Sequence, residues 1–264
     1  MATLWKFYPP HPALASATLT ATTGTSSTLA SSVDNRKLSL MNVDTVGTYV
    51  SGADEFMYKI DFGSTKACDF IAIVNHSLYT TETAQLRVYV DNLDNSGLTN
   101  PITPLGAQSA AAGDEPIWFE AFTASYTKRY FWPLLDSIAA TAYAGLIIIG
   151  AKVEPTNDPN WESDIEIDIE SGRIVNKGPG GYNWKTRTHG VKRGWQVHYE
   201  FLNDADRAIL ENWLSDSDYA DTPFVFTKDG GTVFYYGELI GNPVIKEMQS
   251  GLHNIDFTIS EVIG

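Results

Sequence analysis

The chain has 264 residues, of which 43% are hydrophobic, and it carries 32 acidic against 18 basic side chains, a net charge of −14 at pH 7. This composition is typical of a folded globular protein, and the length allows one large domain or two of medium size. The acidic balance argues against specific nucleic-acid binding, because contacts to phosphates need a basic surface.

Residues 1–12 are predicted to form an extended arm, because aromatic residues and prolines dominate the segment and proline disfavours a helix. The arm has two possible packing partners, its own domain or a neighbouring subunit. The segment has no basic start followed by a long apolar stretch, so no secretory signal is expected. The longest apolar stretch, 138–151, is short and interrupted by polar residues, so no membrane insertion is expected.

Residues 13–154 are predicted to form an antiparallel β-sandwich or jelly roll, because short strand-like segments alternate with clusters of turn residues. The predicted strands are 18–22, 58–62, 70–74, 84–90, 117–122, 129–135 and 145–153. Gly63 is expected to end the second strand, and 91–116 is expected to be a long loop. Cys68 is the single cysteine and is expected to be a buried thiol, so no disulfide staples the fold.

The same region resembles the discoidin-type (F5/8 C-like) jelly rolls. The similar stretches are ATLTAT at 17–22, YKIDFGSTKACDFIAIVNHSL at 58–78, LRVYVDN at 86–92, KRYFWPLL at 128–135 and LIIIGAKVE at 146–154. Phe56 or Tyr58 stands where that family usually has tryptophan, and Phe-Trp-Pro at 131–133 replaces its Trp-Arg. The run at 71–78 resembles the variant of this domain in tail proteins of bacterial viruses.

The resemblance implies that loops of the jelly roll bind cell-surface glycans. The residues expected to contribute are polar groups of a strand-end turn and two aromatic rings, namely Asn75, His76, Tyr79 and Trp118. Each has a structural alternative, since His76 also suits a turn and most tryptophans of such domains belong to the core.

A polar segment at 156–159 marks the predicted domain boundary, which gives a second domain over 155–264. Strands are predicted at 191–201, 223–227, 233–240 and 254–262. One helix is predicted over 204–215, with Asn203 as its N-cap and acidic residues in its first turn. The apolar stripe of that helix is expected to consist of Ala205, Ile209, Leu210, Trp213 and Leu214.

The second domain opens with WESDIEIDIE at 161–170, whose period of two predicts a half-buried strand. Its acidic face comprises Glu162, Asp164, Glu166, Asp168 and Glu170. Side chains two residues apart on a strand stand about 7 Å from one another, so the like charges repel and the face needs solvent or basic partners. Basic residues within 173–193 offer cross-strand ion pairs. The other interpretations are an acidic wall that lines a channel for DNA and a catalytic carboxylate pair.

The order of these elements resembles the β-sandwich-plus-helix domain of phage distal-tail, tail-tube and minor-tail proteins. The chain is therefore expected to be mainly β, with two antiparallel sandwiches, an N-terminal jelly roll and a C-terminal tail-tube-like sandwich with one helix. The resemblance implies a structural virion protein of a phage tail tip that is assembled in the host cytoplasm. It would form a homo-oligomeric ring (trimer or hexamer) around the DNA channel and contact other phage tail proteins.

The alternative is a carbohydrate-binding protein that recognises host surface glycans through the jelly-roll loops. A glycan-cleaving enzyme that uses two acids of 162–170 is a third reading. The histidines are dispersed and no zinc spacing or nucleophile motif occurs, so we expect no catalysis, no metal and no cofactor.

Overall fold

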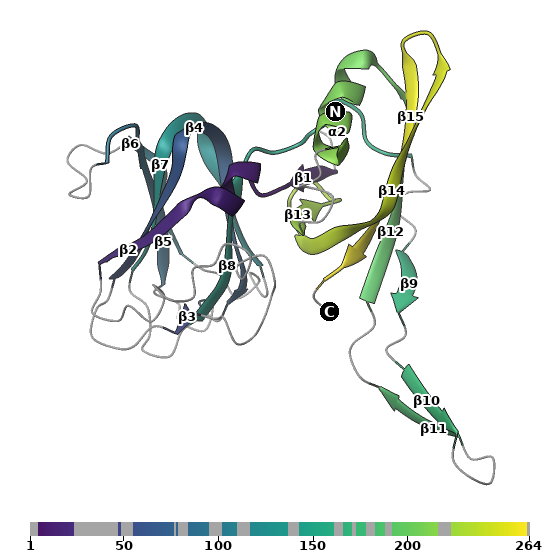
Figure 1. Ribbon diagram of the computed structural model, residues 1–264, viewed down its shortest axis with the longest axis horizontal. Helices are drawn as coiled ribbons and strands as arrows, with labels where there is room; N and C mark the ends of the chain where they lie inside the picture. The colour runs from purple at the N-terminus through teal and green to yellow at the C-terminus, as the bar shows by residue number, and fades with distance from the viewer. Residues whose placement is uncertain are drawn as a thin grey trace. The chain divides into compact units, whose positions relative to one another are not determined.

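The computed structural model describes residues 5–23, 47–48, 55–76, 78, 84–94, 102–109, 117–136, 143–160, 166–170, 173–177, 183–187, 192–215 and 223–262. The chain divides into two compact units, of which one comprises Tyr8–Lys152 and the other Met1–Phe7 with Val153–Gly264. We call them the N-terminal sandwich and the C-terminal unit. Antiparallel strands dominate both, and α2 is the α-helix of the described part, so the predicted fold class is confirmed (Figure 1).

The N-terminal sandwich is built on a seven-stranded sheet with the order β3-β8-β4-β7-β5-β6, in which β2 also pairs with β4. A short 3₁₀ turn, η1 (Pro12–Ser16), precedes these strands. Their bounds are Thr18–Thr23 for β2, Gly47–Thr48 for β3, Glu55–His76 for β4, Gln85–Asp91 for β5, Ile102–Ser109 for β6, Ile117–Asp136 for β7 and Tyr143–Gly150 for β8.

Two long strands, β4 and β7, curve through both layers of the sandwich (Figure 1). The first part of β4 pairs with the last part of β7, as Ile60 with Phe131, and its second part pairs with the first part of β7, as Ile73 with Trp118. Shifts of register separate the two parts, and bulges of this kind bend a strand without ending it. The prediction of separate strands at 58–62 and 70–74, and at 117–122 and 129–135, was therefore wrong.

Gly63 lies at the bend of β4, with a φ of 71° that suits glycine, and its N–H donates to Oδ1 of Asp61 at 2.8 Å. It bends the strand, whereas the sequence predicted that it would end it. The predicted loop at 91–116 was also wrong in part, because β6 lies inside it. The physical reason is that β6 pairs with β5, for example Leu105 with Val88, and this non-local pairing leaves little periodicity in the segment itself.

The core of the N-terminal sandwich follows the alternation of its strands. On β5 every second residue is buried, as the pattern AQLRVYV predicts. Cys68 is fully buried in the same core, and burial, together with the nearby charge of Asp69, raises the pKa of its thiol. The thiol is therefore unreactive at neutral pH.

The C-terminal unit contains a six-stranded sheet with the order β1-β13-β14-β15-β12-β9. These strands span Lys6–Tyr8 (β1), Glu166–Glu170 (β9), Lys192–Leu202 (β12), Phe224–Thr227 (β13), Tyr235–Gln249 (β14) and Leu252–Glu261 (β15). A separate two-stranded ribbon consists of β10 (Arg173–Lys177) and β11 (Asn183–Arg187).

The aromatic arm at the N-terminus supplies β1, the strand that begins the order of this sheet. Phe7 and Val153 exchange both backbone hydrogen bonds, at 3.0 and 2.7 Å. The ring of Phe7 is fully buried and stacks on Trp213, with 4.7 Å between the ring centroids. Trp5 is also buried, and its backbone N–H donates to Oδ1 of Asp158 at 2.9 Å. Trp5 and Phe7 thus pack in the core of their own chain.

The helix α2 spans Asp204–Ser215, as predicted, and Oδ1 of Asn203 caps it by accepting from the N–H of Asp206 at 2.9 Å. Its buried face differs from the predicted stripe, because Ala205 and Ile209 are exposed whereas Asp206 is buried beside Leu210, Trp213 and Leu214. Asp206 accepts hydrogen bonds from the N–H and hydroxyl of Thr156 and from Asn203. These bonds satisfy the buried carboxylate, so Asp206 can lie on the buried face of the helix.

Candidate functional site

Several strand ends of the N-terminal sandwich lie together at one end of it. The end of β7 pairs with two strand starts, that of β4 and that of β5. The start of β5 also pairs with the end of β6. The end of β4 lies opposite the start of β8, which also pairs with β3. In the sequence, these strand ends flank the connections 24–46, 49–54, 77–83, 110–116 and 137–142, and loops on a rigid scaffold commonly carry binding residues.

Asn75 lies at this end with a φ of 55°, a left-handed backbone that is uncommon outside glycine, and its side chain is partly exposed. The next residue, His76, is buried, and its Nδ1 accepts from the N–H of Leu78 at 3.2 Å. Trp118 is buried in the core, and its Nε1 donates to Glu120 at 3.0 Å. His76 and Trp118 lie 6.2 Å apart between ring centroids, so they form a structural pair beneath this end. Tyr79 lies outside the described residues.

The acidic strand is described in its backbone over β9, which lies at the edge of the C-terminal sheet, next to β12. Register sets Asp168 opposite Arg193 and Glu170 opposite Lys192. In the backbone register two basic residues of the segment 173–193 thus stand opposite two acids, and cross-strand ion pairing stays a prediction. Glu162 and Asp164 lie outside the described residues, as do the side chains of Glu166, Asp168 and Glu170.

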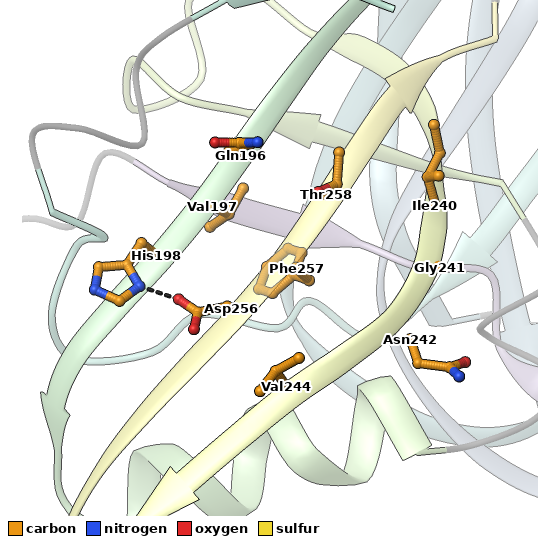
Figure 2. Close-up of a pocket in the computed structure, with 10 residues that line it drawn as sticks. All are labelled: Gln196, Val197, His198, Ile240, Gly241, Asn242, Val244, Asp256, Phe257 and Thr258. Atoms are coloured by element: carbon orange, nitrogen blue, oxygen red, sulfur yellow. Dashed lines mark hydrogen bonds and ion pairs between the residues drawn. The ribbon is translucent and has the colours of Figure 1, made fainter. Parts of the chain in front are cut away.

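A hollow of about 470 Å³ opens on the face of the C-terminal sheet that carries His198 and Asp256 (Figure 2). Register arranges its wall as two rows, with Gln196, Thr258 and Ile240 in one and His198, Asp256 and Val244 in the other. Between Ile240 and Val244 the strand β14 bulges, and Gly241 there has a φ of 71°. The extra residues separate β14 from β15 locally, which makes room for the hollow.

The electrostatics of the hollow centre on His198. Its Nδ1 contacts Oδ1 of Asp256, and its Nε2 lies 3.0 Å from Oε1 of Glu200. Burial lowers the pKa of His198, but the hydrogen bonds and charges of both carboxylates outweigh burial and raise it above the ordinary value. The hydrogen bonds from Asn160 and His198 lower the pKa of Glu200. His198 on β12 is therefore linked to Asp256 on β15, and protonation of its ring strengthens this link.

The sequence did not predict this hollow. Its residues come from three strands, and only the pairing of those strands brings them together. The turn residues Gly241, Asn242 and Pro243 after a predicted strand were the available signal, because such residues in a strand often mark a bulge.

The described residues contain no group of three or more histidine, cysteine and acidic side chains placed to hold a metal ion. Within the described part, no helix has both the length and the apolar character needed to cross a membrane.

No protein-family model matches the chain, and no curated protein matches it. Solved structures that resemble it include the chitosan-binding module 1 of a chitosanase/glucanase from Paenibacillus sp. IK-5, with 18% identity, 52% of this chain and 96% of that chain covered, and a TM-score of 0.37. A pectin-binding carbohydrate-binding module has 15% identity, coverages of 50% and 88%, and a TM-score of 0.36.

The lectin domain of lectinolysin, solved with the Lewis B antigen, has 11% identity, coverages of 53% and 96%, and a TM-score of 0.38. These neighbours are carbohydrate-binding domains. All three TM-scores lie below 0.5, so no residue of this chain takes a role from them.

Proposed function

We propose that this chain is a carbohydrate-binding protein without catalytic activity, and that the loop-bearing end of the N-terminal sandwich recognises the glycan. The observation that carries the proposal is that the ends of β4, β5, β6, β7 and β8 lie together at the end where Asn75 lies. A rigid sandwich that supports several connections at one end is a common design for recognition, because the loops vary while the scaffold holds them in place.

Asn75 is the described residue that we assign to this site. Its carboxamide offers two donors and an acceptor, which suits the paired hydrogen bonds of sugar hydroxyls. The left-handed backbone sets the direction in which the Asn75 side chain leaves the strand. The next residue, His76, is buried against Trp118, which holds this part of β4 in place. Tyr79 is retained as the proposed stacking ring, on the grounds of its place in the sequence.

Replacement of Asn75 by glycine tests this site cleanly, since glycine keeps the positive φ and removes only the amide. We expect the wild-type chain to bind a subset of a printed oligosaccharide array, and Asn75→Gly and Tyr79→Ala to lose at least tenfold in affinity for that subset. Ser125→Ala, exposed on the bend of β7, is the matched control and leaves binding unchanged. An array on which both site variants match the wild type contradicts the proposal.

A second function, assembly into the ring of a phage tail tip, is favoured by one observation. The hairpin of β14 and β15 extends past the neighbouring strands, and residues 244–250 of β14 and its turn are exposed apart from the partly buried Ile245. Val244 and Met248 are 44% and 57% exposed on it. Exposed apolar residues on a projecting hairpin are typical of surfaces that pair with another subunit.

Under this proposal the partner is another copy of the chain, and the acidic strand Glu162–Glu170 lines the passage of the ring. Mass photometry of the wild type at rising concentration is expected to show trimers or hexamers, and Met248→Glu is expected to remain monomeric with unchanged thermal stability. The matched control is Gln249→Glu, which adds the same charge on the same hairpin. A wild type that stays monomeric at every concentration contradicts ring assembly.

A further inference from the structure

We infer that the hollow on the C-terminal unit, together with the exposed ring of Phe201, is a second saccharide-binding site. It lies on a different unit from the glycan site proposed above and does not depend on that site.

The first argument is the set of polar groups that the hollow leaves unused. Within the described part of the chain, the side chains of Gln196, Asn242 and Thr258 form no hydrogen bond, and Oδ2 of Asp256 has no partner. Two carboxamides, a hydroxyl and a carboxylate oxygen supply both donors and acceptors. Neighbouring sugar hydroxyls need this mixture, because each of them donates and accepts at once.

The second argument is the apolar surface beside those groups. Ile240 and Val244 are 42% and 44% exposed, and Figure 2 shows them on β14, next to Thr258 and Asp256 on β15, which separates them from His198 on β12. A pyranose ring has C–H faces and polar edges, so apolar side chains that lie beside polar ones match its two surfaces. A hollow of about 470 Å³ lies in the range of small-ligand sites.

The third argument concerns charge. The basic side chains of His198 and Lys246 and the acidic side chains of Glu200, Glu238 and Asp256 share this face, and His198 contacts Asp256 and Glu200. Charges of both signs are thus mixed around the hollow, and a neutral hydroxylated ligand is the class that we assign to it.

The fourth argument is Phe201, which follows Glu200 on β12. Its φ of 56° lies in the left-handed region, and its side chain is 61% exposed. It sits at a bulge where its N–H donates to Oδ1 of Asn254 at 3.3 Å. The backbone of Phe201 is strained, and its exposed ring gains little stability from burial. Strained residues of this kind are found where a side chain contacts a ligand.

The test compares the full chain and its variants on a printed array of neutral oligosaccharides. We expect one group of glycans to lose at least tenfold in affinity with Asp256→Asn, Gln196→Ala and Phe201→Gly, and to keep full affinity with Asn75→Gly. Gln249→Ala, an exposed amide on the same sheet, is the matched control. Thermal unfolding of each variant establishes that it is folded.

The outcomes separate the two sites. If every bound glycan loses affinity with Asn75→Gly alone, the site in the hollow is overturned and the site on the N-terminal sandwich stands. If every bound glycan loses affinity only with the variants of the hollow, the site on the N-terminal sandwich is overturned and the hollow stands. A silent array overturns both. Affinity that collapses between 50 and 500 mM salt overturns the assignment to a neutral ligand, because only charged ligands are screened in this way.

Discussion

Phe201 shows what a single strained residue costs this chain. A non-glycine residue in the left-handed region costs on the order of 1–3 kcal/mol, and the exposed ring of Phe201 recovers little of it through burial. Phe201→Gly is therefore expected to raise the free energy of unfolding by about 1 kcal/mol in urea titrations, after the entropic cost of glycine is subtracted. Tyr199→Gly on the same strand, where the ring is buried, is expected to destabilise. A neutral or destabilising effect of Phe201→Gly contradicts the strain.

His198 makes stability depend on pH in a direction that the geometry fixes. Its pKa in the folded chain is raised above 6.5 by Asp256 and Glu200 in spite of burial. A raised pKa means that the imidazolium adds stability fully below pH 6.5, and that this contribution is lost as the pH rises through the folded value. We expect the stability difference between the wild type and His198→Asn to fall over that window, as measured by urea titrations at several pH values. A stability difference between the two proteins that stays constant with pH contradicts the ion pairs of His198 with Asp256 and Glu200.

At the scale of elements, β1 is the strand on which the C-terminal unit depends most clearly. Phe7 contacts the rings of Trp213, Phe224 and Phe257, and loss of a fully buried phenylalanine costs about 3–5 kcal/mol. Phe7→Ala is expected to lower the stability of the C-terminal unit by this amount, seen as faster hydrogen exchange in β13 and β14. Lys6→Ala, which removes only a partly exposed ion pair with Glu154, is expected to cost less than 1 kcal/mol. Equal effects of the two variants contradict the role of the ring.

The elements that the sequence predicted well are those whose signal is local. Asn203 and the acids after it mark the start of α2, and the alternation of β5 predicts its buried residues. The elements predicted poorly depend on partners far along the chain. β4 and β7 look like separate strands because the bulges that bend them break the period of two. Asp206 can be buried because Thr156, 50 residues earlier, and Asn203 donate hydrogen bonds to its carboxylate.

The candidate sites follow the same division. Asn75 was predicted from a strand-end turn, which is a local signal. The hollow required knowledge that Ile240 pairs with Thr258 and Val244 with Asp256, and no pattern within β14 or β15 contains that register.

At the scale of the whole molecule, the N-terminal sandwich is inserted between two hydrogen-bonded strand positions of the C-terminal unit. The chain leaves that unit after Phe7 and returns at Val153, and these two residues exchange both backbone hydrogen bonds. Such a pair can be joined by a two-residue turn, for which Asn-Gly is favoured.

A chain in which Asn-Gly replaces residues 8–152 is therefore expected to fold as the C-terminal unit, with one cooperative unfolding transition and the Trp fluorescence of a buried core. The control is the same chain with Phe7→Ala, which should be less stable by about 3–5 kcal/mol. If the Asn-Gly chain does not fold while the full chain does, the C-terminal unit depends on residues 8–152 and is not an independent folding unit.

The position of β1 has a consequence for synthesis in the cell. Trp5 leaves the ribosome long before Phe226, the ring on which it packs, and Phe7 leaves long before its partners Phe224 and Phe257. At about 5–20 residues per second, roughly 10–40 s pass before Phe224 follows Phe7. Residues 8–152 are synthesised within that interval, and throughout it the two aromatic rings lack the partners that bury them. This is the period in which a chaperone that binds aromatic segments has the most to protect.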